Sequence, residues 1–277
     1  MNIKQALKFS EDALETEQSK VDAQYLLSYL FQKTFTWLKT WPDIELTQVQ
    51  VDELHKLVER RKTGEPIAYI TGEKDFWTLQ LLTNSSTLIP RPETELLVES
   101  GLEFLNDIAS AKVLDLGTGT GAIALSIASE RVNDQVTASD HYIGAVELAT
   151  KNAKINNISN VKIIQSDWFK QIEEEPFNLI LSNPPYVDEN DPHLFEGDLI
   201  FEPNTALIAN DNGLSDIKII ITQSLNYLVG GGGLMIEHGF EQGLQIRKLF
   251  EQAGFIDVKI LKDLAGLDRV TMGIKPC

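Results

Sequence analysis

The chain has 277 residues, of which 43% are hydrophobic and 23% are charged. This composition is ordinary for a globular enzyme and excludes a collagen-like or wholly disordered protein. Asp and Glu number 41 against 24 Lys and Arg, a formal net charge of -17, so free nucleic acid is disfavoured as a substrate. The single cysteine, Cys277, excludes an intramolecular disulfide and a cysteine-based metal cluster. Because the sequence shows neither an apolar signal segment nor a membrane-spanning run, we expect a cytoplasmic protein.

Residues 1–64 are expected to form a small helical domain. Apolar residues recur there at helical spacing, with charged residues between them, from residue 3 to about residue 62. Ser19 is expected to cap one of the helices, with Asp22 three residues further on. Gly64-Glu65-Pro66 is expected to end the helical region.

Residues 65–90 are expected to form a β-hairpin connector. Short apolar runs at 67–70 and 76–77 are separated by glycine, asparagine and serine, a pattern that is typical of short strands joined by turns. The segment Pro90-Arg91-Pro92-Glu93 then predicts an extended entry into a helix from about Glu93 to Asn106.

Residues 91–277 are expected to form an α/β domain with a seven-stranded, mostly parallel, Rossmann-like sheet. Strand-like and helix-like apolar runs alternate beyond residue 110, which is typical of a parallel sheet with helices on both faces. The run from Gly230 to Gly233 is expected to be a flexible turn, because no Lys-Ser or Lys-Thr follows it as in a phosphate-binding loop. The predicted strands are 112–116, 135–139, 161–165, 177–182, 233–237, 257–261 and 270–274. The predicted helices are 122–130, 143–156, 215–228 and 241–251.

A glycine-rich turn follows the first of these strands. Its residues are Gly117, Thr118, Gly119, Thr120 and Gly121. Glycines let the backbone approach a cofactor closely, and the helix that follows offers free N–H groups. The spacing also suits nicotinamide- and flavin-binding enzymes, so the turn alone leaves the cofactor open.

Residues at the ends of the next two strands are candidates for binding a nucleoside. Asp140 lies 23 positions after Gly117 (140 minus 117), close to the interval of about 20 at which an acidic residue binds ribose hydroxyls. Alternatively, Asp140 caps the helix that begins near residue 143. Asp167 and Trp168 follow the third strand, where a carboxylate can accept from an adenine amino group and an indole can stack on the ring.

The most discriminating motif is Asn183-Pro184-Pro185-Tyr186, which follows a predicted buried strand and is expected where open α/β folds bind ligands. Two prolines stiffen the loop and remove two N–H donors. The Asn183 side-chain oxygen and the Pro184 carbonyl can then accept from an amide or amine, and Tyr186 can pack against the same planar group. These features favour methyl transfer from S-adenosylmethionine to nitrogen, driven by positioning rather than by a general base. A polyproline recognition segment is the alternative, and the preceding buried strand disfavours it.

No metal site is expected in this chain. The histidines are scattered, and none forms the i, i+4 pair of a helical zinc site. The acidic stretch from Asp188 to Asp198 is typical of a solvated loop, although it also suits a basic partner segment. The histidines are His55, His141, His193 and His238.

These motifs resemble those of the bacterial release factor glutamine methyltransferases, over essentially the whole chain. Two positions differ from the family pattern. Thr120 stands where serine is frequent, and Ile200 stands where an arginine is expected before Phe201-Glu202-Pro203. The segments that carry the resemblance are 64–72, 88–95, 115–119, 166–169, 183–186, 201–203 and 268–270.

The resemblance implies a methyltransferase fold that uses S-adenosylmethionine. It implies methyl transfer to the side-chain amide nitrogen (N5) of the glutamine in the Gly-Gly-Gln motif of class I peptide chain release factors 1 and 2. Methyl-donor binding is implied for the turn from Gly117 to Gly121 and for Asp140, Trp168 and Asn183, and glutamine binding for the Asn183–Tyr186 loop. The helical domain is implied to grip the release factor. We expect a monomer that binds neither nucleic acid nor a membrane.

Three other functions are compatible with parts of the same pattern. A DNA adenine methyltransferase would share the Asn183–Tyr186 loop, but the acidic charge and the lack of a basic run or a target-recognition domain count against it. An enzyme acting on a ribosomal-protein glutamine would also share the loop, and the full-length motif match favours the release factor. A binding module built on the same scaffold is disfavoured because the donor turn and the substrate loop are both intact.

Overall fold

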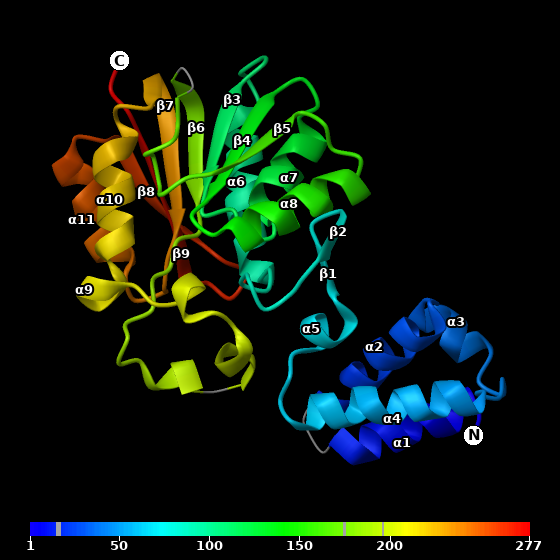
Figure 1. Ribbon diagram of the computed structural model, residues 1–277. Coiled ribbons are helices and arrows are strands. Elements are labelled where there is room, and N and C mark those ends of the chain that lie inside the picture. The colour runs from blue at the N-terminus through cyan, green and yellow to red at the C-terminus, as the bar shows by residue number, and fades with distance from the viewer. Residues whose placement is uncertain (15–17, 174–175, 196) are drawn as a thin grey trace. The chain divides into compact units, whose positions relative to one another are not determined.

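The chain forms two compact units (Figure 1). The first comprises Met1–Glu73 and Phe195–Phe201, and the second comprises Lys74–Leu194 and Glu202–Cys277. The predicted connector at 65–90 is therefore divided between the units. The structure is a computed structural model that describes residues 1–14, 18–173, 176–195 and 197–277. Among those residues, no helix combines the length and the apolar character needed to cross a membrane.

Helices around an apolar core make up most of the first unit. The core side chains come from α1, α2 and α4 at three- and four-residue spacing, and they include Leu26, Leu27, Leu54 and Val58. The prediction that Ser19 caps a helix is wrong: Ser19 is the first helical residue, and the residue before it makes no side-chain cap bond. The helices are α1 (Ile3–Leu14), α2 (Ser19–Phe31), α3 (Phe35–Thr40) and α4 (Gln48–Lys62).

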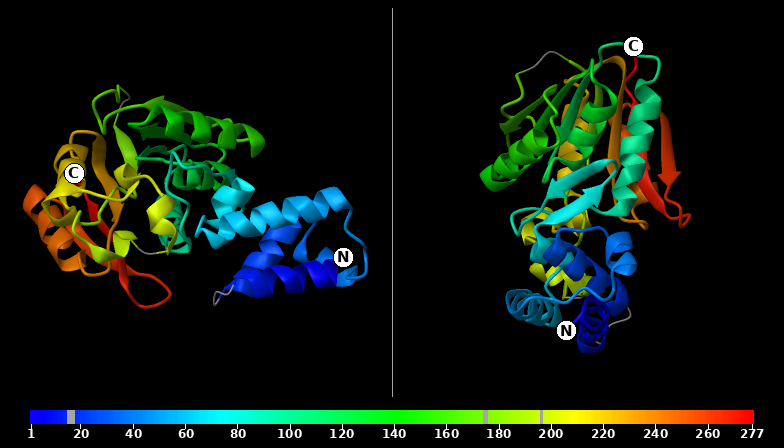
Figure 2. Two further views of the ribbon diagram at one scale, coloured as in Figure 1. Left: turned by 60° about the horizontal axis from the view of Figure 1, so that its bottom comes forward. Right: turned by 90° about the vertical axis from the view of Figure 1, so that its right-hand side faces the viewer.

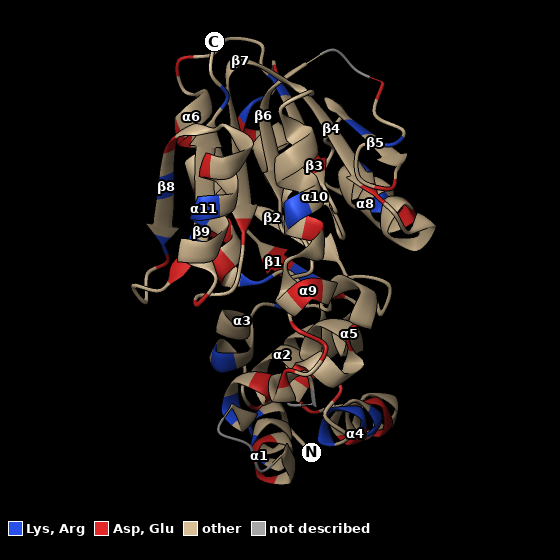
Figure 3. Cartoon of the chain, turned by 90° about the vertical axis from the view of Figure 1, so that its left-hand side faces the viewer, with Lys and Arg blue, Asp and Glu red and all other residues tan. Residues whose placement is uncertain are grey.

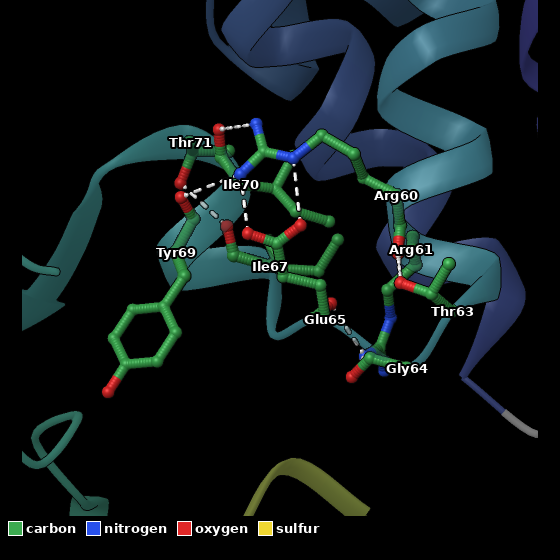
Figure 4. A network of polar contacts seen from close by, with 9 residues as sticks. All are labelled: Arg60, Arg61, Thr63, Gly64, Glu65, Ile67, Tyr69, Ile70 and Thr71. Carbon is green, nitrogen blue, oxygen red and sulfur yellow. Dashed lines mark hydrogen bonds and ion pairs between the residues drawn. The ribbon is translucent and has the colours of Figure 1, made fainter. Parts of the chain in front are cut away.

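Arg60, in the last turn of α4, holds the segment that follows this helix (Figure 4). Its guanidinium forms a bidentate ion pair with Glu65, with Nε–Oε2 and Nη2–Oε1 distances of 2.8 and 2.5 Å. It also donates to the carbonyl oxygens of Tyr69 and Ile70. These carbonyls belong to a short helix, α5 (Ile67–Thr71), where the sequence predicted a strand-like run. The run is therefore helical rather than extended, and Arg60 of α4 binds its last carbonyl groups.

Arg61, the next residue, connects three parts of the first unit. Its Nε lies 2.8 Å from Asp22 Oδ2 in α2, and its Nη1 lies 3.3 Å from Asp198 Oδ1 in the 3₁₀ turn η3 (Gly197–Phe201). The Asp22 side chain is only 6% exposed, so this pair is largely shielded from water. Figure 3 shows the basic end of α4 in blue.

A β-hairpin leads into the second unit. Its strands are β1 (Glu73–Phe76) and β2 (Leu79–Leu82). Between them, the backbone N–H of Trp77 donates to Glu95 Oε1 over 2.9 Å, which ties the hairpin to the first residue of α6 (Glu95–Leu105).

A seven-stranded sheet forms the centre of the second unit, with strand order β5-β4-β3-β6-β7-β9-β8. Neighbouring strands are parallel except that β9 runs antiparallel to β7 and β8. The predicted seven-stranded, mostly parallel, Rossmann-like sheet is therefore confirmed. The strands are β3 (Lys112–Leu116), β4 (Gln135–Asp140), β5 (Val161–Gln165), β6 (Phe177–Ser182), β7 (Leu228–Glu237), β8 (Ile256–Lys262) and β9 (Asp268–Ile274).

Helices cover both faces of this sheet (Figures 1 and 2). On the face covered by α6, α7 and α8, Val113 and Leu179 join one core cluster. On the face covered by α10 and α11, Leu114 and Ile180 join another. Successive strand residues thus point to opposite buried layers, which explains the continuous apolar runs. The remaining elements are α7 (Ala122–Glu130), α8 (Ile143–Ile155), α9 (Asn210–Gly213), α10 (Ser215–Ser224), α11 (Gly243–Ala253), η1 (Pro92–Thr94), η2 (Pro192–Phe195) and η4 (Asn204–Ala206).

The run from Gly230 to Gly233 lies inside β7, so the prediction of a flexible turn is wrong. Gly231 has a φ of +79°, and the register of β7 with β6 shifts beside this run, as in a β-bulge. A Cβ on Gly232 would lie 3.0 to 3.1 Å from three backbone carbonyl oxygens. A side chain at this position would push the neighbouring backbone by a few tenths of an ångström, so the close approach favours glycine.

Candidate active site

A cavity of about 370 Å³ lies in the second unit, within the range of small-molecule binding sites. The ends of β4 and β6 and the turn after β3 contribute to its wall, as the parallel topology predicts. Gly121, Pro184 and Tyr186 adjoin lining residues in the chain but are not part of the wall. The predicted site residues that line the cavity are Gly117, Thr118, Gly119, Thr120, Asp140, Asp167, Trp168, Asn183 and Pro185.

The turn after β3 depends on left-handed backbone conformations. Gly117, Gly119 and Gly121 have φ values of +73°, +55° and +87°, which residues with a Cβ rarely adopt. The N–H groups of Gly117 and Thr118 both donate to the carbonyl oxygen of Ser139 over 2.9 Å. The turn is therefore held against the end of β4.

Asp115, in β3, stabilises the same turn and was not among the predicted site residues. Its Oδ2 accepts from Thr118 Oγ1 at 2.6 Å and from the backbone N–H of Ala124 at 3.2 Å. Burial raises the pKa of Asp115 to about 7, although these two hydrogen bonds oppose the shift. The sequence does contain a signal for this role, namely a carboxylate inside an otherwise apolar strand. Acidic residues are almost never fully buried without a partner, so such a residue is expected to make specific hydrogen bonds.

Asp140, at the end of β4, makes two backbone contacts through different oxygens. Oδ2 accepts from the N–H of Gly119 and Oδ1 from the N–H of Tyr142, each over 2.9 Å. Burial raises the pKa of Asp140, and both hydrogen bonds oppose that shift. The cap-like contact at the entry to α8 is therefore present, and the same largely buried side chain also lines the cavity.

Trp168 and Asp167 have different surroundings. A Cβ on Gly117 would lie 3.5 Å from the Trp168 ring, so the indole lies directly against the glycine turn. The interaction of Asp216 in α10 with Trp168 opposes a rise in the Asp216 pKa that is caused by burial. Asp167 instead pairs with Lys170 over 2.6 Å. Asp216 lines the cavity as well, and no local motif marks it in the sequence.

The Asn183–Tyr186 loop is anchored at both ends. Asn183 Nδ2 donates to Thr94 Oγ1 over 3.2 Å. The Tyr186 carbonyl accepts from Gln242 Nε2 at 3.0 Å, and its hydroxyl lies 3.5 Å from Glu237 Oε1. Burial raises the pKa of Tyr186 above its ordinary value, so its hydroxyl stays protonated at neutral pH.

An ion pair between Arg91 and Glu202 joins two segments of the cavity wall. Arg91 Nη2 lies 2.5 Å from Glu202 Oε1, and the N–H of Ile89 donates to Glu202 Oε2 at 3.3 Å. The Glu202 side chain is fully buried. Arg91 and, on the other segment, Thr205 both line the cavity. The sequence motifs around both residues do not predict their pairing, because 111 positions separate them.

Solved structures share the fold of this chain. A methyltransferase from Pyrococcus furiosus has a TM-score of 0.54 and 20% identity, with 73% of this chain and 91% of that chain covered. The catalytic domain of hMettl16 has a TM-score of 0.58 and 15% identity, with 86% and 84% covered. At these identities the likeness shows the fold alone.

Sequence comparisons define the family. A family model described as the PrmC N-terminal domain matches residues 5–72, and one described as the methyltransferase small domain matches 93–227. A release factor glutamine methyltransferase of Aliivibrio fischeri is 50% identical, over 99% of this chain and 97% of that protein. The protein of the same name from Escherichia coli is 47% identical, over 93% of each chain. The chain therefore belongs to the release factor glutamine methyltransferase family.

Proposed function

We propose that this enzyme transfers a methyl group from S-adenosylmethionine to the side-chain amide nitrogen N5 of a glutamine. The proposed substrate is the Gly-Gly-Gln motif of class I release factors 1 and 2. The observation that carries the proposal is that Asn183 and Pro185 line the same cavity as the glycine turn and Asp140. One cavity thus brings the proposed nucleoside-binding residues together with the proposed amide-binding loop.

The residues of this cavity fit S-adenosylmethionine. Each Asp140 oxygen accepts one backbone N–H, which leaves lone pairs for two ribose hydroxyls. A Cβ on Gly119 would meet no atom closer than 3.9 Å, so the missing side chain leaves room for a ligand against the turn. The Trp168 indole offers an apolar ring in the same wall. When bound, S-adenosylmethionine supplies an electrophilic methyl group on a positively charged sulfur.

Asn183 and its neighbours are the proposed amide-binding residues. Because Asn183 Nδ2 is used by Thr94, its side-chain oxygen remains available to accept from a substrate amide. The Pro184 carbonyl is proposed as the second acceptor, and Tyr186 as the residue that packs against the amide plane. Holding both N–H groups orients the nitrogen lone pair, and this positioning accounts for most of the expected acceleration.

The release factor is proposed to bind the helical unit as well as the cavity. We assign partner recognition to the predicted domain at 1–64, the connection to residues 65–90 and the chemistry to residues 91–277. Acidic residues occur in both units (Figure 3), and the net charge of -17 favours a partner with a basic face. We expect the enzyme to act as a monomer.

The test is methylation of purified, unmodified release factor 1 or 2 by the purified protein with labelled S-adenosylmethionine. We expect label on the Gly-Gly-Gln glutamine, located by mass spectrometry of the isolated peptide, and none on a release factor in which that glutamine is replaced by alanine. Duplex DNA and unmodified ribosomal proteins serve as parallel substrates. Transfer to either of these, with none to the release factor, would contradict the proposal.

A further inference from the structure

Gln242 lies at the start of α11, and its side chain is bonded to the last carbonyl group of the proposed amide-binding loop. Gln242 Nε2 donates to the Tyr186 carbonyl oxygen over 3.0 Å and to that of Asn212 over 3.4 Å. Gln242 Oε1 accepts from the backbone N–H of Gly239 at 2.9 Å. This one side chain therefore joins the loop after β6, the turn before α10 and the residues that follow β7.

The contact with Gly239 fixes the direction in which the Gln242 amide points. A backbone N–H group only donates, so it selects the oxygen of the side-chain amide. The NH₂ group is then turned toward Tyr186 and Asn212, where its two hydrogens meet two carbonyl oxygens. Gln242 therefore presents a donor, and not an acceptor, to the Tyr186 carbonyl.

The turn at residues 211–213 lies against the same carbonyl group. Asp211, Asn212 and Gly213 all have left-handed backbone conformations, with φ values of +59°, +54° and +79°. Residues with a Cβ keep such conformations only where neighbouring contacts hold them. A Cβ on Gly213 would lie 2.1 Å from the Tyr186 carbonyl oxygen and 2.9 Å from Gln242 Nε2. The hydrogen bond between Gln242 and Tyr186 is therefore closely packed on this side.

The composition of the loop makes this anchor important. Pro184 and Pro185 carry no N–H group, so neither can donate a backbone hydrogen bond. Directly after the loop, the N–H of Val187 donates to the carbonyl oxygen of Leu207 over 2.9 Å. Because the two proline rings fix φ at adjacent residues, a displacement of Tyr186 is passed on to the Pro184 carbonyl, the second proposed acceptor.

We propose that Gln242 is a positioning residue that holds the Asn183–Tyr186 loop in its substrate-binding geometry by fixing the Tyr186 carbonyl. It acts from outside the site, because the described residues that line the cavity do not include it. The inference rests on the proposed function, in which Asn183 and Pro184 accept from a glutamine amide. Misplacing such groups by about 1 Å can lower a rate about 100-fold.

The first test measures methylation kinetics of Gln242→Met and Gln242→Glu with unmodified release factor. Methionine has a similar length but no donor, so kcat is expected to fall on the order of tenfold, as for loss of one productive hydrogen bond. Glutamate also directs a carboxylate oxygen at the Tyr186 carbonyl, so kcat should fall further, on the order of 100-fold. Because Gln242 does not line the cavity, KM for the release factor and Kd for S-adenosylmethionine should each change by less than about threefold.

Gln245→Glu is the matched control for these variants. Gln245 is an exposed residue of the same helix, so its replacement introduces the same charge without removing the bond to Tyr186. Gln245→Glu should retain kcat. A lower melting temperature of Gln242→Met, with kcat equal to that of Gln245→Glu, would indicate a purely structural role and would overturn the inference.

The second test observes the Tyr186 carbonyl without turnover. Tyr186-Val187 is the only Tyr-Val pair in the sequence, so ¹³C on the tyrosine carbonyl and ¹⁵N on valine isolate this one peptide group by NMR. Its ¹³C signal should shift in both Gln242 variants and stay in place in Gln245→Glu, and an unchanged signal in Gln242→Met would overturn the inference. A wild type that transfers no methyl group to the release factor would contradict the proposed function, whereas an active wild type with fully active Gln242→Met would contradict only the role of Gln242.

Discussion

The backbone N–H of Gly119 donates to Oδ2 of Asp140 over 2.9 Å. This bond joins the turn after β3 to the end of β4, and the second oxygen of the same carboxylate holds the entry to α8 through Tyr142. One side chain thus shapes two segments of the cavity wall. Its effect on ligand binding is therefore expected to exceed that of a single lost contact.

Asp140→Asn is expected to weaken S-adenosylmethionine binding. The neutral amide keeps one acceptor but turns a donor toward either the ribose or a backbone N–H, so at least one charged hydrogen bond is lost. Such a loss corresponds to a rise in Kd on the order of 10- to 100-fold, measurable by isothermal titration calorimetry. Glu147→Gln removes an exposed charge from α8 and should leave Kd unchanged. An unaltered Kd for Asp140→Asn would exclude the ribose contact.

Asn183→Ala is expected to impair catalysis more than donor binding. Removing the side-chain oxygen leaves only the Pro184 carbonyl to hold the substrate amide, and losing one group of a preorganised site typically lowers kcat by about 10² to 10³. Methylation rates and S-adenosylmethionine affinity should be measured on the same preparation. A rate near that of the wild type would remove the proposed role of the Asn183 oxygen.

Gly213→Ala is expected to displace the Asn183–Tyr186 loop at its Tyr186 end. Gly213 has a φ of +79°, and a Cβ there would lie 2.1 Å from the carbonyl oxygen of Tyr186, a distance that requires the backbone to move. Gly266, in the same unit, also has a φ of +79° but would meet no atom within 4 Å. Gly266→Ala therefore isolates the conformational strain, about 1 kcal/mol.

Urea unfolding and kcat distinguish the two glycine variants. The unfolding free energy of Gly213→Ala should fall by clearly more than the ~1 kcal/mol expected for backbone strain alone. Its kcat should also fall, because Tyr186 has to shift. Gly266→Ala should retain kcat. Equal losses of stability and activity in both variants would show that the contact with Tyr186 is unimportant.

Most of the sheet could be predicted from the sequence, because both of its faces are buried. Continuous apolar runs such as 177–182 match the observed strand within a residue, and α7 has the predicted bounds. The helical run at 67–70 and the extended start of β7 could not be predicted in this way. Both segments make contacts with residues distant in the sequence. The guanidinium of Arg60 donates to carbonyl groups of α5, and the start of β7 forms a glycine bulge beside β6.

The candidate site was predictable only where its residues lie in local motifs. The glycine turn, Asp140 and Asn183 could be identified because each directly follows a buried strand and the topology brings these ends together. Thr94, Asp216 and Glu202 were not identified, because their partners Asn183, Trp168 and Arg91 are distant in the sequence. The functional roles of the predicted residues remain predictions until the variants are measured.

Arg61→Met is expected to destabilise the helical unit. The change leaves the largely buried carboxylate of Asp22 without its 2.8 Å partner, and breaking a buried pair from one side typically costs about 3 kcal/mol. Lys62→Met removes a neighbouring cation whose pair with Glu59 is exposed on both sides, so its cost should stay below about 1 kcal/mol. Limited proteolysis of α1–α4 compares the stability of the two variants. Equal protection of Arg61→Met and Lys62→Met would contradict the predicted role of the buried ion pair.

Asp115 is expected to make stability depend on pH in a direction opposite to that of a salt-bridged carboxylate. Burial raises its folded-state pKa from 3.8 to about 7, so the folded protein retains the proton while the unfolded chain loses it. The stabilising contribution is fully present below the unfolded pKa and is lost as the pH rises through about 7. Between pH 4 and pH 8 the unfolding free energy should therefore decline through this group.

Asp115→Asn removes this titration while leaving an oxygen that can accept from Thr118 and Ala124. The unfolding free energy of the variant minus that of the wild type should rise with pH between 4 and 8, by on the order of 2 to 4 kcal/mol. Taking the difference cancels the titration of the other carboxyl groups. Urea titrations at four or more pH values measure this slope. A difference that stays constant with pH would mean that Asp115 is ionised in the folded protein, and that the bonds from Thr118 and Ala124 outweigh the cost of its burial.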